Sequence, residues 1–204
     1  AVRQSLEGSG IRPGHKVLLK PNLCNPVKKA VTHPEFIRAV IEVVKETTEL
    51  VYLSDLPAVN EQNITEKVLQ ETGVMQVLKD TKTKYSNIEK SGFLVRGIRD
   101  YRVLEKTDFA KIFFYADVVI NLPKLKTHGQ MYITGAVKNL MGLIHMDERG
   151  YLHRSFNREG FADGLIDIYN FMKNKTRINI MDAVEAMDGK GPVDGDIVNM
   201  GYVL

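Results

Sequence analysis

Apolar residues along this chain follow two kinds of spacing, and the two kinds alternate. Residues 117–122 form a nearly continuous apolar run and residues 16–20 form a second one, which is typical of strands covered on both faces. Residues 34–47 and 159–172 instead keep the spacing of helices with one apolar face. Strands that alternate with helices predict an α/β fold, with a mainly parallel sheet in a three-layer α/β/α arrangement.

Shorter elements complete the predicted fold. We expect further strands at residues 50–53, 93–96, 101–105, 178–181 and 200–204. We expect further helices at residues 64–71, 75–79, 109–116 and 134–144. The length suits a single domain over residues 1–204. Because residues 200–204 resemble a strand that is cut at its end, we expect a truncated domain that continues beyond them.

Composition narrows the classes of function. Of the 204 residues, 44% are hydrophobic and 26% are charged, as in an ordinary globular protein. No apolar run approaches the roughly 20 residues that span a bilayer, and the N-terminus lacks a signal-peptide pattern, so we expect a cytoplasmic protein without a membrane partner. The net charge of +3 and the absence of tryptophan argue against nucleic acid. With Cys24 as the single cysteine, the chain cannot hold an iron–sulfur cluster by its own thiolates.

Polar residues recur where the predicted strands end. Lys20 and Asn22 follow the first strand, Asp55 follows the second, and Asp182 and Glu185 follow the strand at residues 178–181. Ligands of open α/β sheets bind beyond the carboxyl ends of the strands. We therefore predict a site at this edge, with Asp55, Asp182 and Glu185 as acid, base or metal ligands. Solvated strand ends are the alternative interpretation.

The segment after the strand at residues 117–122 contains two lysines and a histidine. If this segment is extended, Lys124, Lys126 and His128 share one face. Such positive groups repel one another unless an anion, or a carboxylate from another strand, lies between them. Their crowding would also lower their pKa values, as acid–base or Schiff-base chemistry requires. Alternatively, the side chains reach water from the strand end.

Two downstream segments offer further binding residues. Thr134 precedes a predicted helix that carries Lys138 and Asn139, and the start of a helix offers free backbone N–H groups to an anion. Lys138 is either functional or lies on the single exposed stripe of an otherwise buried helix. Gly191 and Gly195 lie in a glycine-rich turn that lacks the P-loop ending. A tight turn is the simpler interpretation of these glycines.

Other polar residues receive structural interpretations. His33 is expected to help start the helix at residues 34–47, and His145 and His153 are expected at the surface. A lone buried thiol is the default interpretation of Cys24, and a redox or metal role is the alternative.

Several motifs occur in a characteristic order along the chain. They are Val-Leu-Leu-Lys-Pro-Asn-Leu, Thr-His-Pro-Glu, Ser-Asp-Leu-Pro, Asn-Leu-Pro-Lys-Leu-Lys-Thr-His, Ala-Val-Lys-Asn-Leu-Met-Gly and Gly-Pro-Val-Asp-Gly. This order resembles the family known as domain of unknown function 362, whose members are described as related to iron–sulfur centre proteins. Many members carry a ferredoxin-type segment with four-cysteine clusters, which this chain lacks. The resemblance implies a ferredoxin-type iron–sulfur domain or protein as a partner.

A weaker resemblance links the chain to the lactate racemase family, which uses a nickel-pincer nucleotide. His128 and Lys138 follow the order of a histidine and a cofactor-attached lysine in that family, and Asp55 stands at its Asp-His motif. The chain departs from that family in two places. No histidine follows Asp55, and Asn-Leu-Met-Gly stands where the family has Pro-Gly.

Two hypotheses about function follow. In the first, an enzyme or cofactor-handling domain, which could be redox-linked, binds a small anionic ligand or a metal ion. Its predicted catalytic residues are His128, Lys138 and Lys126, and its predicted ligand-binding residues are Lys20, Asn22, Lys124, Asn139, Thr134, Gly191 and Gly195. In the second, a non-catalytic scaffold docks onto an iron–sulfur partner. The second hypothesis predicts an exposed apolar patch in place of a deep pocket.

Overall fold

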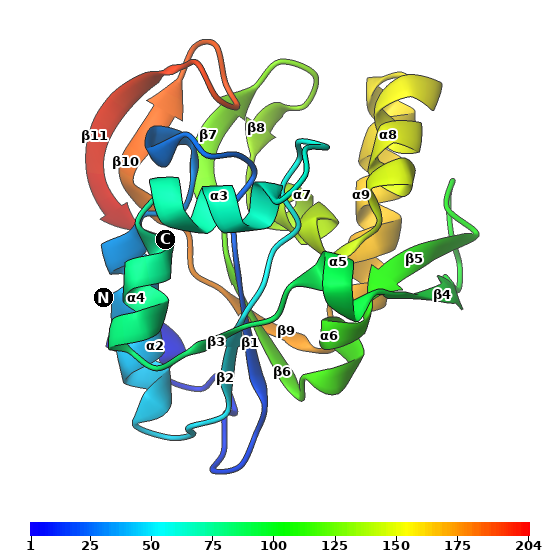
Figure 1. Ribbon diagram of the computed structural model, residues 1–204. Coiled ribbons are helices and arrows are strands. Elements are labelled where there is room, and N and C mark those ends of the chain that lie inside the picture. Colours follow the sequence, from blue (N-terminus) through cyan, green and yellow to red (C-terminus); the bar gives the residue numbers. More distant parts are fainter.

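A five-stranded parallel sheet forms the centre of the computed structural model, which describes residues 1–204. Its strands are β1 (Val17–Pro21), β2 (Val51–Leu53), β3 (Lys84–Tyr85), β6 (Val118–Leu122) and β9 (Thr176–Asn179). They lie in the order β3-β2-β1-β6-β9 (Figure 1). From β1 the chain builds outward to β2 and β3 on one side, and later to β6 and β9 on the other. The chain order therefore reverses between β1 and β6, where open α/β sheets commonly bind ligands.

Helices cover both faces of this sheet, which confirms the predicted α/β architecture. One layer contains α1 (Val2–Leu6), α2 (Pro34–Lys45), α3 (Ile64–Glu71) and α4 (Val74–Asp80). The other contains α6 (Lys111–Tyr115), α8 (Met146–Ser155) and α9 (Arg158–Met172), which Figure 1 shows on the opposite side of β1. Successive side chains of a strand point to opposite faces. Accordingly, Val17 and Leu19 of β1 join the first core, and Leu18 joins the second.

The first crossover helix forms as its sequence predicts. His33 is the N-cap residue of α2, and its ring accepts a hydrogen bond from the backbone N–H of Glu35. Pro34 occupies the first helical position, where its missing N–H costs nothing. Ile37, Val40, Ile41 and Val44 are buried along one face of the helix.

A second sheet of four strands extends beyond the carboxyl ends of the first. It consists of β7 (Lys124–His128), β8 (Tyr132–Thr134), β10 (Asp182–Asp188) and β11 (Asp196–Val203), in the order β11-β10-β7-β8. This sheet was not predicted, because most of its residues have the pattern of strand ends and a turn. Pro123 alone separates β6 from β7. Because proline has no N–H to donate, it ends pairing in the first sheet and lets the chain enter the second.

Several predicted elements differ from those observed. The strand predicted at residues 101–105 is wrong, because that segment lies outside both strands of the hairpin of β4 (Phe93–Gly97) and β5 (Lys106–Ala110). The helix predicted at residues 109–116 starts only at Lys111, since the chain before it pairs with β4. The helix predicted at residues 134–144 divides into α7 (Ala136–Asn139) and a 3-10 turn, Leu140–Leu143.

Other elements begin or end at residues that differ from the predicted ones. β9 ends at Asn179 and β11 starts at Asp196, each earlier than predicted. The sequence analysis missed α8, and it missed the short helix α5 (Ile88–Ser91). None of the helices is both long enough and apolar enough to cross a membrane.

Candidate functional site

A small polar cavity of about 90 Å³ lies at the carboxyl ends of β1 and β2, next to the point where the strand order reverses. Its walls come from the loops after these strands and from α7, the 3-10 turn and α8. The lining residues are Lys20, Asn22, Cys24, Asp55, Leu56, Ala58, Lys138, Asn139, Met141, Gly142, Arg149 and His153. Five of the predicted site residues therefore meet here: Lys20, Asn22, Asp55, Lys138 and Asn139.

Lys20 and Asp55 form a buried ion pair in the wall of this cavity. Lys20 Nζ lies 2.9 Å from Asp55 Oδ1, and neither side chain is more than 4% exposed. Lys20 Nζ also donates to the carbonyl of Pro21, and Asp55 Oδ2 accepts from the backbone N–H of Leu23. The approach of Lys20 to Oδ1 is poorly aligned for a hydrogen bond, so this carboxylate oxygen has no aligned donor. Burial lowers the pKa of Lys20, and the charge of Asp55 opposes that shift.

Gly142 is required because the ion pair lies directly against its backbone. A Cβ atom on Gly142 would lie 1.8 Å from Asp55 Oδ1 and 2.5 Å from Lys20 Cε. No side chain fits in that space. The glycine of the Lys-Asn-Leu-Met-Gly motif therefore makes room for the buried charges.

Buried asparagines connect the strands and the helix that border the cavity. Asn139 Nδ2 donates to the carbonyl of Lys20 and to Asn121 Oδ1, at 3.0 and 2.8 Å. Asn22 Nδ2 donates to Asn139 Oδ1, and Asn121 Nδ2 donates to Asn179 Oδ1. Since these amides mostly satisfy one another, Asn22 and Asn139 hold β1, β6 and α7 together at the cavity. The sequence analysis missed Asn121, which lies inside an otherwise apolar strand.

Arg149 is a charged residue of the cavity wall that the sequence did not predict. Its side chain is buried, Nη1 donates to the carbonyls of Leu56 and Pro57, and Nε donates to the carbonyl of Ile144. Nη2 is buried and has no partner. Burial lowers the pKa of Arg149 to about 10, so the guanidinium stays protonated at neutral pH. A buried cationic donor without an acceptor is costly.

A sequence signal for Arg149 exists at the start of α8. His145 caps the helix, and Asp147 and Glu148 occupy its first turn, as a helix start requires. Once the helix is recognised, Arg149 and His153 are four residues apart and share one face. His153 is exposed as predicted, yet it also lines the cavity.

Lys138 faces the cavity without a carboxylate partner. Its Nζ lies 3.7 Å from Met141 Sδ and 5.4 Å from the centre of the Phe161 ring. Burial, and then the charges of Arg149 and Lys126, lower the pKa of Lys138 to about 8. A substantial fraction of this amine is therefore uncharged under mildly alkaline conditions.

His128 lies beside this group, although it does not line the cavity. Its ring stacks on that of His153 with centroids 6.1 Å apart. His128 Nδ1 accepts from the backbone N–H groups of Gln130 and Met131, so the neutral ring carries its proton on Nε2. Burial, with the charge of Lys138, lowers the pKa of His128 to about 4. The ring is therefore neutral at pH 7.

Lys126 holds residues of the cavity wall in place. Its buried Nζ donates to the carbonyl of Ala30 at 2.6 Å, to Asn22 Oδ1 at 2.9 Å and to Cys24 Sγ at 3.2 Å. An ammonium group has three donors, so all of them are engaged. Lys126 thus positions Asn22 and Cys24, and its predicted catalytic role has no free donor to rely on.

The predicted metal ligands lie in two different places. Asp182 pairs with Lys124 through a contact of 3.0 Å, with both side chains at most 2% exposed. A carboxylate from another strand is thus the partner of Lys124, as one interpretation of its segment required. Glu185 lies with Asp182 in a separate hollow beside His33, and Asp55 lies in the cavity. No three histidine, cysteine, aspartate or glutamate side chains are grouped closely enough to hold a metal ion.

The remaining predicted ligand-binding residues lie outside the cavity. A Cβ atom on Gly191 would lie 2.0 Å from the carbonyl oxygen of Thr127, and one on Gly195 would lie 2.3 Å from that of Asp188. These close approaches to backbone give both glycines a packing role, and neither has the positive φ that the tight-turn interpretation assumed. Thr134 ends β8, and its buried Oγ1 has no partner.

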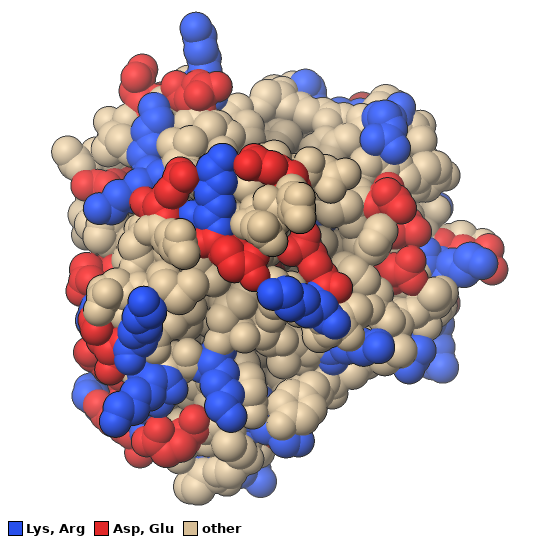
Figure 2. Space-filling view, viewed as in Figure 1, with Lys and Arg blue, Asp and Glu red and all other residues tan.

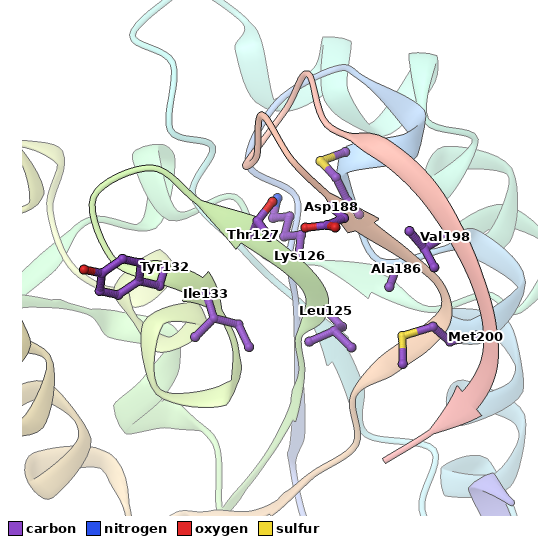
Figure 3. Close-up of a pocket in the computed structure, with 10 residues that line it drawn as sticks. Leu125, Lys126, Thr127, Tyr132, Ile133, Ala186, Asp188, Val198 and Met200 are labelled. Carbon is purple, nitrogen blue, oxygen red and sulfur yellow. The ribbon is translucent and has the colours of Figure 1, made fainter.

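The second sheet carries a different kind of surface. Strands β7, β8, β10 and β11 surround an apolar groove of about 280 Å³, whose lining residues appear in Figure 3. Ile133 is 53% exposed there, Val198 is 42% exposed and Met200 is 40% exposed. On the face shown in Figure 2, positive and negative side chains are interspersed instead of forming one basic field. Nucleic-acid binding would favour a basic field.

The fold and the cavity define the class of protein: a parallel α/β domain with a cationic cavity at the carboxyl edge of its sheet. More particularly, the chain belongs to the domain of unknown function family DUF362, whose model matches residues 17–204.

The relatives and structural neighbours are longer than this chain. A thylakoid-associated protein of Synechocystis sp. is 28% identical over 199 residues, which cover 96% of this chain and 60% of that protein. The lactate racemase apoprotein of Thermoanaerobacterium thermosaccharolyticum superposes with a TM-score of 0.56 at 14% identity, over 97% of this chain and 50% of that one. A protein from Thermotoga maritima gives a TM-score of 0.57 at 10% identity, over 99% of this chain and 52% of that one. At these identities the structural matches show a shared fold.

Proposed function

We propose that the cavity binds a small anion with carboxylate-like or phosphate-like oxygens. The observation that carries this proposal is Arg149, a residue of the cavity wall whose buried Nη2 has no partner. Lys138 adds a second positive group that no carboxylate neutralises. Asp55 is the one carboxylate among the lining residues, and Lys20 already opposes its charge. The cavity therefore has more positive than negative charge.

Physical cost favours an anion as the missing component. Removing a charged group from water costs several kcal/mol unless a counter-charge and hydrogen bonds compensate. A bound anion would give Arg149 Nη2 an acceptor in a place that water reaches poorly. The volume of about 90 Å³ leaves room for a ligand of only a few non-hydrogen atoms. We favour an anion over a metal ion because the donor side chains that a metal needs are not grouped.

Calorimetric titration with acetate, pyruvate, phosphate and sulfate tests the proposal. At least one of these anions should bind the wild type. Arg149→Met should weaken its binding at least tenfold, since a charge-assisted hydrogen bond contributes about 1.5–3 kcal/mol. Arg154→Met is the matched control, because Arg154 is an exposed arginine on the same helix. Arg149→Lys provides a variant that retains the buried charge.

Two outcomes would overturn the proposal. One is a wild-type protein that binds none of the four anions. The other is an Arg149→Met variant that is folded and binds as tightly as the wild type.

The scaffold hypothesis keeps one observation in its favour. The apolar groove on the second sheet matches the exposed patch that this hypothesis predicted. The cationic cavity does not follow from it, since docking alone requires no buried unpaired arginine. Docking onto a ferredoxin-type iron–sulfur partner therefore stays a prediction, and we place anion binding ahead of it.

A further inference from the structure

Four buried or partly buried lysines surround the carboxyl edge of the sheet, and three of them have at least one oxygen partner. Lys20 pairs with Asp55, and Lys124 pairs with Asp182. Lys126 donates to two oxygens and a sulfur. Only Lys138 has no oxygen acceptor, and its amine contacts a thioether and an aromatic ring instead.

The position of Lys138 suits a nucleophilic amine. It lines the same cavity as Arg149, so a ligand held by the guanidinium would lie within the space that Lys138 faces. Amines become nucleophiles in proteins when apolar surroundings and a neighbouring cation disfavour their protonated form. Met141, Phe161 and Arg149 provide both conditions here.

We propose that Lys138 forms an imine with the carbonyl group of a small oxo acid whose carboxylate is bound by Arg149. This inference rests on the proposed anion binding and adds the class of ligand and the type of bond. Nη2, the one guanidinium nitrogen of Arg149 that is not engaged, can donate to a carboxylate oxygen. The limited volume favours an acid of two or three carbons. The required carbonyl group distinguishes this ligand from a simple anion such as acetate.

The reaction needs no oxidant or reductant. The neutral amine of Lys138 attacks the carbonyl carbon, and one proton moves from nitrogen to oxygen to give a carbinolamine. The hydroxyl group then leaves with a second proton as water, and the carbon–nitrogen double bond forms. Amine and carbonyl are thus converted to imine and water. Besides the lysines and Arg149, the titratable groups that face this space are Asp55, which is paired with Lys20, Cys24 and a neutral His153.

The protonation state of Lys138 supports the proposal. With a pKa of about 8, roughly a tenth of the amine is unprotonated at pH 7, against less than about a thousandth for an ordinary lysine. The fraction of Lys138 present as the nucleophilic amine is therefore a few hundred times larger than for a surface lysine.

Borohydride trapping tests the inference on the whole chain. The protein is incubated with pyruvate or glyoxylate and reduced with borohydride, and the adduct is counted by intact mass and located by peptide mapping. We expect about one adduct per chain, on Lys138. Acetone, which has the carbonyl group without the carboxylate, should label at least tenfold less. Glycolaldehyde phosphate tells whether a phosphate group can replace the carboxylate.

Lysine variants show which residue carries the adduct. Lys138→Arg keeps the positive charge and should abolish labelling, and Lys138→Met provides a second variant if the first is poorly folded. Lys190→Arg, in the exposed turn, is the matched control and should label as the wild type does.

The results separate this inference from the proposed function. If pyruvate and acetate bind in calorimetry but no adduct forms, imine formation is wrong and anion binding stands. Equal labelling of wild type and Lys138→Arg would also overturn it. If phosphate or sulfate binds but pyruvate does not, the oxo acid is wrong and anion binding stands; if none of the four anions binds, the anion site itself is wrong.

Discussion

Two lysine–aspartate pairs lie buried at the carboxyl edge of the sheet, and locally they resemble each other closely. Lys20 and Asp55 are 2.9 Å apart, and Lys124 and Asp182 are 3.0 Å apart. Their surroundings differ. The carboxylate of Asp182 also accepts the backbone N–H groups of His33 and Val184, so both of its oxygens are used. Asp55 Oδ1 has no aligned donor.

The two pairs therefore have different consequences. Lys124 and Asp182 belong to β7 and β10, so their contact joins two strands of the second sheet. Lys20 and Asp55 border a cavity that also contains Arg149 and Lys138, where positive charge exceeds negative charge. The same residue types at strand ends form a structural link where both carboxylate oxygens have donors. They border a candidate binding site where cations have no carboxylate partner.

The largest expected effect is on the saturated pair. Lys124→Met leaves Asp182 buried without its counter-charge and should lower the free energy of unfolding by about 3–5 kcal/mol. Urea denaturation followed by circular dichroism measures this loss. The double variant Lys124→Met with Asp182→Asn should recover part of it. If the single variant lost less than 1 kcal/mol, the link between the strands would carry little of the stability.

A smaller effect is expected for the pair at the cavity. Lys20→Met should cost about 2 kcal/mol, less than Lys124→Met, because the buried charge of Arg149 still attracts Asp55. The same denaturation experiment compares the two variants. An equal or larger loss for Lys20→Met would show that the excess positive charge of the cavity does not compensate Asp55.

The glycine against the cavity pair provides a steric test. Gly142→Ala should cost about 1–3 kcal/mol, since its methyl group overlaps Asp55 Oδ1 and the ion pair must move. It should also weaken anion binding in calorimetry. Gly129→Ala is the matched control, because a Cβ atom there meets nothing within 4 Å. Equal stability of the two variants would contradict the required close approach.

The smallest effect concerns the unpaired amine of the cavity. The folded-state pKa of Lys138 is about 8, below that of an unfolded lysine, so the unfolded chain binds more protons between pH 8 and 10. Stability from this group therefore rises with pH through that window, by about 1–2 kcal/mol. Urea denaturation at pH 7 and pH 10 gives the free energy of unfolding of the wild type and of Lys138→Met. The difference between the two proteins isolates the contribution of Lys138 from those of the other titratable groups. A difference that does not change with pH would contradict the lowered pKa.

Some of the fold and site followed from local pattern. The continuous apolar runs at β1 and β6 predicted buried parallel strands, because such runs are stable only between two layers of helices. The rule that ligands bind at carboxyl ends then brought Lys20, Asn22 and Asp55 to one edge. Lys138 and Asn139 also lie at this edge, as their motif had indicated.

Other features depended on contacts between distant residues. The second sheet pairs β7 with β10, about 60 residues away in sequence, and its strands are too mixed in polarity to be recognised alone. Arg149 reaches the cavity from a helix with little amphipathic pattern, so no local signal placed it beside Asp55.

The sequence by itself thus determined the kind of sheet, the edge where charges collect and the residue types available there. The tertiary structure decided which lysine meets which aspartate, and which cation is left without a partner. The physical reason is that hydrophobic periodicity acts over a few residues, whereas a buried charge is matched by whichever opposite charge the whole fold brings within contact. Lys124 meets such a charge, and Lys138 does not.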